Sequence, residues 1–337
     1  MNQITWRSAR VVGPAVTLLA LVLLATGIGS SWIGPDRVLL AVFGQGSATD
    51  TIIIWTLRLP RVALAVLAGA ALGLAGLLLQ RVVRNPIASP SVLGIVDGAA
   101  VGVVLFLWVF SNEANALMVS IQWQPMAATA GATTFAVMVA ILAGRDIAQP
   151  ARLILYGIAM AALAKSLVTV LVILGPVYRA SQALIWLAGS VHAAHWEDAA
   201  ILSIVLVTVL CLLALLRRSI GQMVLDDTTA TATGLVPVLG KGVILILSVV
   251  LTSAAVSFAG GIAFVGLIAP NAARALVGLD TDRLLFVTPI VGAAMVLCAD
   301  IIARVVAYPL ELPTGAVTAL VGAPYFLFLL LRQIRHV

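Results

Sequence analysis

Arginines stand out where long apolar stretches of this sequence give way to short polar ones. Arg58 and Arg61 are three residues apart, and Arg304 follows Asp300 by four. A guanidinium group binds a carboxylate through two parallel hydrogen bonds, so exposed arginines can dock an acidic partner. On a helix, spacings of three or four residues place side chains on one face, so Asp300 and Arg304 can also form an ion pair within the chain. Both interpretations, a docking patch and internal ion pairs, fit the pattern.

Other polar residues suggest less. Lys165 lies within an apolar run, where a charge is costly and usually faces a cavity or a partner, so it is a candidate for lining a pathway or for an internal ion pair. His192 and His195 precede two acidic residues and could bind a metal weakly, but solvated loop residues explain them better. We find no catalytic constellation and expect neither an enzyme nor a metal site.

The composition indicates that the elements positioning these residues lie in lipid. Of 337 residues, 62% are hydrophobic and only 9% are charged, whereas soluble domains are about 25% charged. We therefore relate the net charge of +6 to the distribution of Lys and Arg between the two sides of a bilayer. We expect no nucleic acid partner. No segment fits the phosphate-binding pattern that ends in Lys followed by Ser or Thr, so any ATP must be bound by another chain.

Apolar runs cut by charges, Pro and Gly predict an all-α membrane protein with ten transmembrane helices. Residues 1–34 could also be a cleaved signal peptide, but the apolar run is long enough to span, so we interpret it as the first helix. With both termini in the cytoplasm, most of the 19 Lys and Arg residues fall on the inner side, as the positive-inside rule requires. The predicted spans are 11–28, 58–82, 91–110, 122–143, 152–174, 197–216, 241–258, 262–277, 284–306 and 314–332.

A polar segment, residues 217–241, is the longest interruption on the predicted inner side. Asp226 and Asp227 can cap a short helix through Thr228–Thr233, which Gly234 would end. So short a helix is ordered only when it packs against something, so this segment is either a solvated loop or a cytoplasmic element that contacts a partner.

Short motifs in a fixed order along almost the whole chain resemble the cobalamin and ferric-siderophore permeases of type II ABC importers. They comprise Arg58-Leu59-Pro60-Arg61, Gln80 with Arg84-Asn85-Pro86-Ile87-Ala88-Ser89-Pro90, Leu93-Gly94 with Gly98-Ala99, Phe264-Val265-Gly266-Leu267-Ile268-Ala269-Pro270, Asp300 with Arg304, Glu311-Leu312-Pro313-Thr314-Gly315, and Gly322-Ala323-Pro324-Tyr325-Phe326. Two positions depart from the family pattern. Asn271 stands where the family usually has His, and the coupling segment reads Leu225-Asp226-Asp227 rather than Leu-Gly-Glu.

The resemblance implies a ten-helix type II importer permease fold with three functional regions. Two permease subunits, identical or homologous, would enclose one pathway, served by two cytoplasmic ATPase subunits and a periplasmic substrate-binding protein. The residues implicated are Arg58, Arg61 and Arg304 in binding-protein docking, Leu225, Asp226, Asp227, Thr228 and Gly234 in ATPase coupling, and Gly144, Arg145, Asp146 and Arg152 in an inner gate.

We therefore expect the permease subunit of an ATP-driven importer in the bacterial inner membrane, with a ferric siderophore as substrate. This chain would bind no cofactor, because ATP and Mg²⁺ would belong to the ATPase subunit. Cobalamin or haem import by the same architecture is the alternative within the family. An ion-coupled transporter working alone is the alternative from another class.

Overall fold

The computed structural model describes residues 2–29, 31–112, 116–144, 149–175, 177–225, 227–234 and 236–334. Helices dominate this part of the chain, and an isolated bridge between Ser111 and Leu117 is the β pairing it contains. The described residues include seven helices long and apolar enough to cross a membrane and three shorter apolar helices. An all-helical membrane protein is therefore confirmed, and ten apolar helices agree with ten spans.

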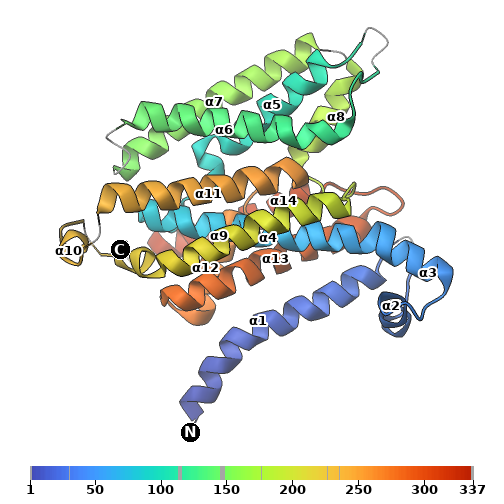
Figure 1. Cartoon of the computed structure of the whole chain (residues 1–337), viewed down its shortest axis with the longest axis horizontal. Helices are drawn as coiled ribbons and strands as arrows, with labels where there is room; N and C mark the ends of the chain where they lie inside the picture. The colour runs from blue at the N-terminus through green and yellow to red at the C-terminus, as the bar shows by residue number, and fades with distance from the viewer. Residues whose placement is uncertain are drawn as a thin grey trace.

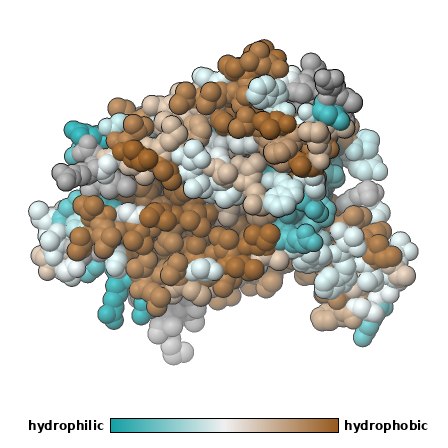
Figure 2. Space-filling model, turned by 45° about the horizontal axis from the view of Figure 1, so that its top comes forward, coloured by the Kyte–Doolittle hydropathy of each residue, from teal (hydrophilic) through white to brown (hydrophobic). Residues whose placement is uncertain are grey.

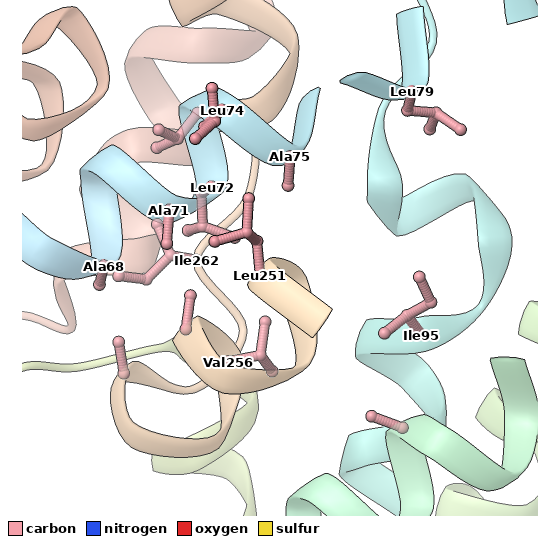
Figure 3. Close-up of a cluster of buried hydrophobic side chains, with 14 of the residues drawn as sticks. Ala68, Ala71, Leu72, Leu74, Ala75, Leu79, Ile95, Leu251, Val256 and Ile262 are labelled. Carbon is pink, nitrogen blue, oxygen red and sulfur yellow. The ribbon is translucent and has the colours of Figure 1, made fainter. Parts of the chain in front are cut away.

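Helix α4 (Leu59–Val83) forms the centre of the bundle and is buried along almost its whole length. It packs against α13 (Thr281–Val306), α11 (Pro237–Ala259), α12 (Val265–Val277) and α9 (Trp196–Gln222). Figure 3 shows alanines and leucines of α4 beside Leu251 and Val256 of α11.

Glycines let the neighbouring backbones come this close to α4. A Cβ atom on Gly69 would lie 2.3 Å from the carbonyl oxygen of Gly292, and one on Gly76 only 1.7 Å from that of Gly266. No side chain fits at either distance. Close backbone approach supplies the packing between helices in lipid, where the hydrophobic effect does not drive them together.

A second group of helices packs beside this centre (Figure 1). It contains α5 (Ile95–Val109), α6 (Gln124–Ala143), α7 (Pro150–Leu174) and α8 (Val177–Ala188), of which α5 and α6 pack most closely. The short α8 lies between the fifth and sixth predicted spans. The 3-10 turns η2 (Pro90–Leu93) and η3 (Ile121–Trp123) precede α5 and α6.

The two ends of the bundle carry different small elements. At one end are α2 (Pro35–Val42), α3 (Ala48–Ile52) and the π-helical turn η1 (Ile53–Arg58), and at the other is α10 (Asp227–Ala232) (Figure 1). The turn η1 runs directly into α4, so the second long helix begins well before the predicted span.

Peripheral helices expose apolar side chains. Only 17% of the apolar window of α1 (Asn2–Gly27) is buried, against 83% for the segment from α3 through α4. Figure 2 shows a broad hydrophobic expanse across one face, with hydrophilic residues gathered towards its edges. These exposed leucines and valines need lipid around them. The last helix, α14 (Thr314–Ile334), packs on α13.

Candidate functional site

The arginine motif forms a buried ionic cluster at the end of the bundle that carries α2 and α3. Arg61 donates two hydrogen bonds to Oδ1 of Asp300, at 3.0 and 2.8 Å, and a third to Oε2 of Glu311 at 2.8 Å. Arg304 donates to Oδ2 of Asp300 at 2.5 Å. Asp300 is fully buried, so two guanidinium groups share one desolvated carboxylate. The ion pair predicted between Asp300 and Arg304 is therefore present.

The same arginines also hold the C-terminal end of α1. Arg58 donates to the carbonyl oxygens of Thr26 and Gly27, at 2.9 and 2.7 Å, and Arg304 donates to that of Ala25 at 3.0 Å. The last carbonyls of a helix lack partners within the helix and carry partial negative charge. Two cations therefore satisfy the end of α1 and attach it to α4 and α13.

None of the three arginines is freely exposed, since the exposed fractions of Arg58, Arg61 and Arg304 are 6%, 7% and 7%. The sequence spacing also predicts that Arg58 and Arg61 share a face; Arg58 bonds to the end of α1 and Arg61 bonds to Asp300. Arg304 bonds both to the end of α1 and to Asp300, so it connects the partners of the other two arginines. The role of the cluster in docking stays a prediction.

Glu311 forms the exposed margin of this cluster. Its side chain is 37% exposed, and Oε2 lies 2.8 Å from both Arg61 Nη1 and His192 Nδ1. Partial burial raises the pKa of Glu311, but the hydrogen bonds and positive charge of Arg61 and His192 together outweigh it, so the net shift is downward. The sequence gives Glu311 only as part of a motif, and its partners lie far away along the chain.

At the opposite end, Asp227 connects α10 to two long helices. Its carboxylate accepts hydrogen bonds from Lys241 Nζ, at 3.0 and 2.9 Å, and from Arg84 at 2.6 Å. Arg84 ends α4 in a left-handed conformation, and Lys241 lies in the first turns of α11 with only 3% of its side chain exposed. The bonds from Lys241, followed by those from Arg84, lower the pKa of Asp227.

The rest of the predicted coupling segment surrounds this anchor. Leu225 accepts a hydrogen bond from Arg84 through its carbonyl oxygen, and Thr228 is exposed on α10. Gly234 has a φ of +89°, the left-handed conformation expected of the residue that ends a helix. Asp226 lies outside the described residues.

The predicted gate region is described only at its two sides. Gly144 ends α6 with a φ of +46°, and Arg152 is exposed in the first turn of α7. Arg145 and Asp146 lie outside the described residues. Lys165 is exposed on α7, and Asp97 of α5 lies within electrostatic range of it.

Asn271, which departs from the family pattern, has a clear structural role. Its side-chain amide donates to the carbonyl oxygens of Pro86 and Leu267, at 2.9 and 2.8 Å. Gln80 donates to the carbonyl oxygen of Ala88 at 3.1 Å, so α12 and α4 both hold the proline-rich loop between α4 and α5. The amide of Asn271 therefore connects a carbonyl of this loop to α12.

Comparison with known proteins places this geometry in a transport family. The family model described as the FecCD transport family matches residues 17–332. The chain belongs to this family, and it is a transport protein that crosses the membrane several times.

Two curated relatives and one solved structure agree with this assignment. The chain is 42% identical to the "Probable siderophore transport system permease protein YfhA" of Bacillus subtilis (strain 168), over 92% of this chain and 91% of that protein. It is 37% identical to the "Achromobactin transport system permease protein CbrC" of Dickeya dadantii (strain 3937), over 95% and 90%. A structure described as an inward-facing conformation of a metal-chelate type ABC transporter aligns with a TM-score of 0.82 and 26% identity, over 96% of this chain and 99% of that one.

Proposed function

We propose that this chain is the permease subunit of an ATP-driven importer that carries a ferric siderophore across the bacterial inner membrane. The observation that carries the proposal is its 42% identity, over nine-tenths of both chains, to a relative named for siderophore transport. Cobalamin is the second candidate, because the cobalamin import permease BtuC of Halobacterium salinarum (strain ATCC 700922 / JCM 11081 / NRC-1) is 39% identical over 84% of this chain and 74% of that protein.

The proposal requires partners. A second permease subunit, identical or homologous, completes the pathway, and two ATPase subunits bind ATP and Mg²⁺ on the cytoplasmic side. A periplasmic binding protein delivers the siderophore to the end that carries α2 and α3, and both termini of this chain are cytoplasmic. The absence of a phosphate-binding loop from the sequence supports a separate ATPase.

Docking of the binding protein, in this scheme, replaces the ion pair between Arg61 and Glu311. Arg61 is held on its buried side by Asp300 and on its exposed side by Glu311. A carboxylate on the binding protein competes with Glu311 for that exposed side, while Arg58 and Arg304 maintain the local positive charge. Exchange of one carboxylate for another costs less than desolvating a free arginine, because the guanidinium remains paired throughout.

Coupling to the ATPase subunits, in this scheme, uses the ion pairs of Asp227 at the other end of the bundle. When the ATPase subunits close, they move α10, and Asp227 passes this displacement to α4 through Arg84 and to α11 through Lys241. Residues 144–152 act as the inner gate, and Lys165 lines the pathway. Each input shifts the equilibrium between outward-open and inward-open states only as far as it binds one of them better.

Uptake into proteoliposomes tests the function. The chain is reconstituted with its candidate second permease and ATPase subunits, and radioactive iron is delivered as the siderophore bound to the candidate binding protein. We expect uptake that needs ATP and the binding protein. Cobalamin uptake under the same conditions would favour the second candidate, and iron uptake driven by an ion gradient alone would overturn the importer assignment.

Affinity for the binding protein tests docking separately. Glu311→Gln removes the internal competitor, so we expect tighter docking, whereas Arg61→Gln should weaken it and reduce its dependence on salt. Arg37→Gln is the matched control, because Arg37 lies at the same end and pairs with Asp50 instead. Unchanged affinity in both the Glu311 and the Arg61 variants would contradict the docking scheme.

A further inference from the structure

A long groove lies between α6, α9 and α11, away from the ionic clusters described above. Its volume is about 770 Å³, within the range of roughly 300–1,000 Å³ typical of ligand pockets. Apolar side chains line most of it, among them Val137, Ile201 and Ile246, which are also exposed on the outside of the helices. The groove is therefore open to the medium that surrounds the bundle, which is lipid.

One end of the groove carries acidic charge. Glu197 and Asp198, in the first turn of α9, line it there, together with Gln122 just before α6. Phe258, at the C-terminal end of α11, lies at the same end of the groove. Among the described residues that line the groove there are two carboxylates and no lysine or arginine, so this mouth attracts a cation and repels an anion.

Deeper in the groove there is a hydroxyl group without a partner. Ser253 of α11 is 4% exposed, and its Oγ has no hydrogen bond among the described residues. Its helical neighbours behave differently, since Thr252 and Ser257 each donate to the carbonyl oxygen four residues earlier, at 2.8 and 2.7 Å. A buried hydroxyl left without an acceptor is destabilising, so Ser253 can donate to an acceptor that a bound ligand supplies.

The distance between the acidic mouth and the Ser253 hydroxyl matches the distance between two polar groups of a phospholipid. Ser253 is six residues before the end of α11 at Ala259, which is roughly 9 Å along a helix. In a phosphatidylethanolamine molecule, the head-group amine and the ester carbonyls are separated by a comparable distance along the bilayer normal. From Phe258 to Gly242 the lining of α11 extends over roughly 24 Å, long enough for a head group and its acyl chains in one leaflet.

We propose that this groove binds phosphatidylethanolamine from the adjoining leaflet. The ammonium lies between Glu197 and Asp198, an ester carbonyl accepts from Ser253 Oγ, and an acyl chain fills the apolar length between α6 and α11. A second apolar cavity, between α1, α13 and α14, offers a contrast, because its charged lining residue is Arg10. The lipid preference of the two cavities should therefore differ.

Native mass spectrometry of the full chain, released from detergent with defined lipids, tests the proposal. We expect phosphatidylethanolamine to bind in preference to phosphatidylglycerol. Glu197→Gln should reduce that preference about fivefold, which is ~1 kcal/mol at 1.4 kcal/mol per tenfold. Ser253→Ala should weaken both lipids equally, because both contain the ester. Asp282→Asn, an exposed acid on α13, and Ser203→Ala, whose hydroxyl already bonds to Ala200, are matched controls.

Equal binding of the two lipids by the unaltered chain would overturn the proposal, as would a preference that survives Glu197→Gln. A photocrosslinking amino acid at the exposed Ile246 gives an independent result. Crosslinks to lipid support a lipid site. Crosslinks to another protein subunit in the assembled transporter would show that protein covers the groove, and would also overturn the proposal.

Discussion

The two ends of this bundle hold their charges in opposite ways. At the end near α2 and α3, one fully buried carboxylate serves two arginines, Arg61 also bonds to the partly exposed Glu311, and carbonyl groups at the end of α1 accept from Arg58 and Arg304. Near α10, a half-exposed carboxylate serves two cations, of which only Lys241 is buried. A desolvated cluster resists change, because any loss leaves a buried charge unpaired, whereas a half-solvated one can exchange partners with water. Loss of a buried partner should therefore cost more stability at the first end than loss of a partner at the second.

Asp300→Asn tests the buried cluster near α2 and α3, where we expect the largest effect. Both Arg61 and Arg304 would lose their buried counter-charge, and we expect a loss of ~3–5 kcal/mol in stability. Thermal unfolding of the detergent-solubilised protein measures the loss, with Asp282→Asn, an exposed acid on the same helix, as the control. If both variants unfold at the same temperature, the cluster does not hold this end together.

Arg58→Met tests whether the arginines hold α1. The carbonyl groups of Thr26 and Gly27 would lose a charged donor while the apolar bulk is kept, so we expect a loss of ~2–3 kcal/mol. Cysteine crosslinking between α1 and α13 should also become slower. A variant with normal crosslinking and normal stability would show that α1 is attached by its apolar contacts alone.

Asp227→Asn tests the half-exposed ion pairs at the other end of the bundle. Because Asp227 is 46% exposed, we expect a loss of only ~1 kcal/mol in stability, but a large loss of ATP-driven uptake. The pKa of Asp227 is lowered in the folded protein, so its ion pairs stabilise the fold above the ordinary carboxyl pKa and are lost as pH falls through the lowered value. Uptake and unfolding measured on the same preparation check both statements. Equal fractional losses of uptake and of stability would argue against a coupling role.

Gly234→Ala should have the smallest effect. A φ of +89° strains any residue with a Cβ, although no described atom lies within 4 Å of where that Cβ would be, so we expect a loss of ~1 kcal/mol or less. Gly242→Ala is the matched control: it also has open space but lies in an ordinary helical conformation, where alanine is favourable. If Gly234→Ala were neutral and uptake unchanged, the end of α10 would not need its left-handed turn.

The sequence predicts the local parts of this structure well and the distant parts poorly. Hydropathy locates the apolar helices, and a spacing of four residues predicts the pair between Asp300 and Arg304. Nothing in one sequence, however, connects Arg61 to Asp300, which is 239 positions away, or Arg84 to Asp227. Charge counting assigns Arg84 and Lys241 to the inner side of the membrane without revealing their shared partner. Nor does any residue pattern predict the π-helical turn that ends at Arg58.

The glycine-lined packing of α4 also has a consequence for biogenesis. Synthesis of α4 is complete at Val83, whereas its partners α11, α12 and α13 begin only at Pro237 and beyond. At 5–20 residues per second, the ribosome needs on the order of ten seconds to produce the first of them. During that time, the grooves at Gly69 and Gly76 must be occupied by acyl chains or by a membrane insertase, so the innermost helix of the finished protein enters the membrane well before the helices that cover it are made.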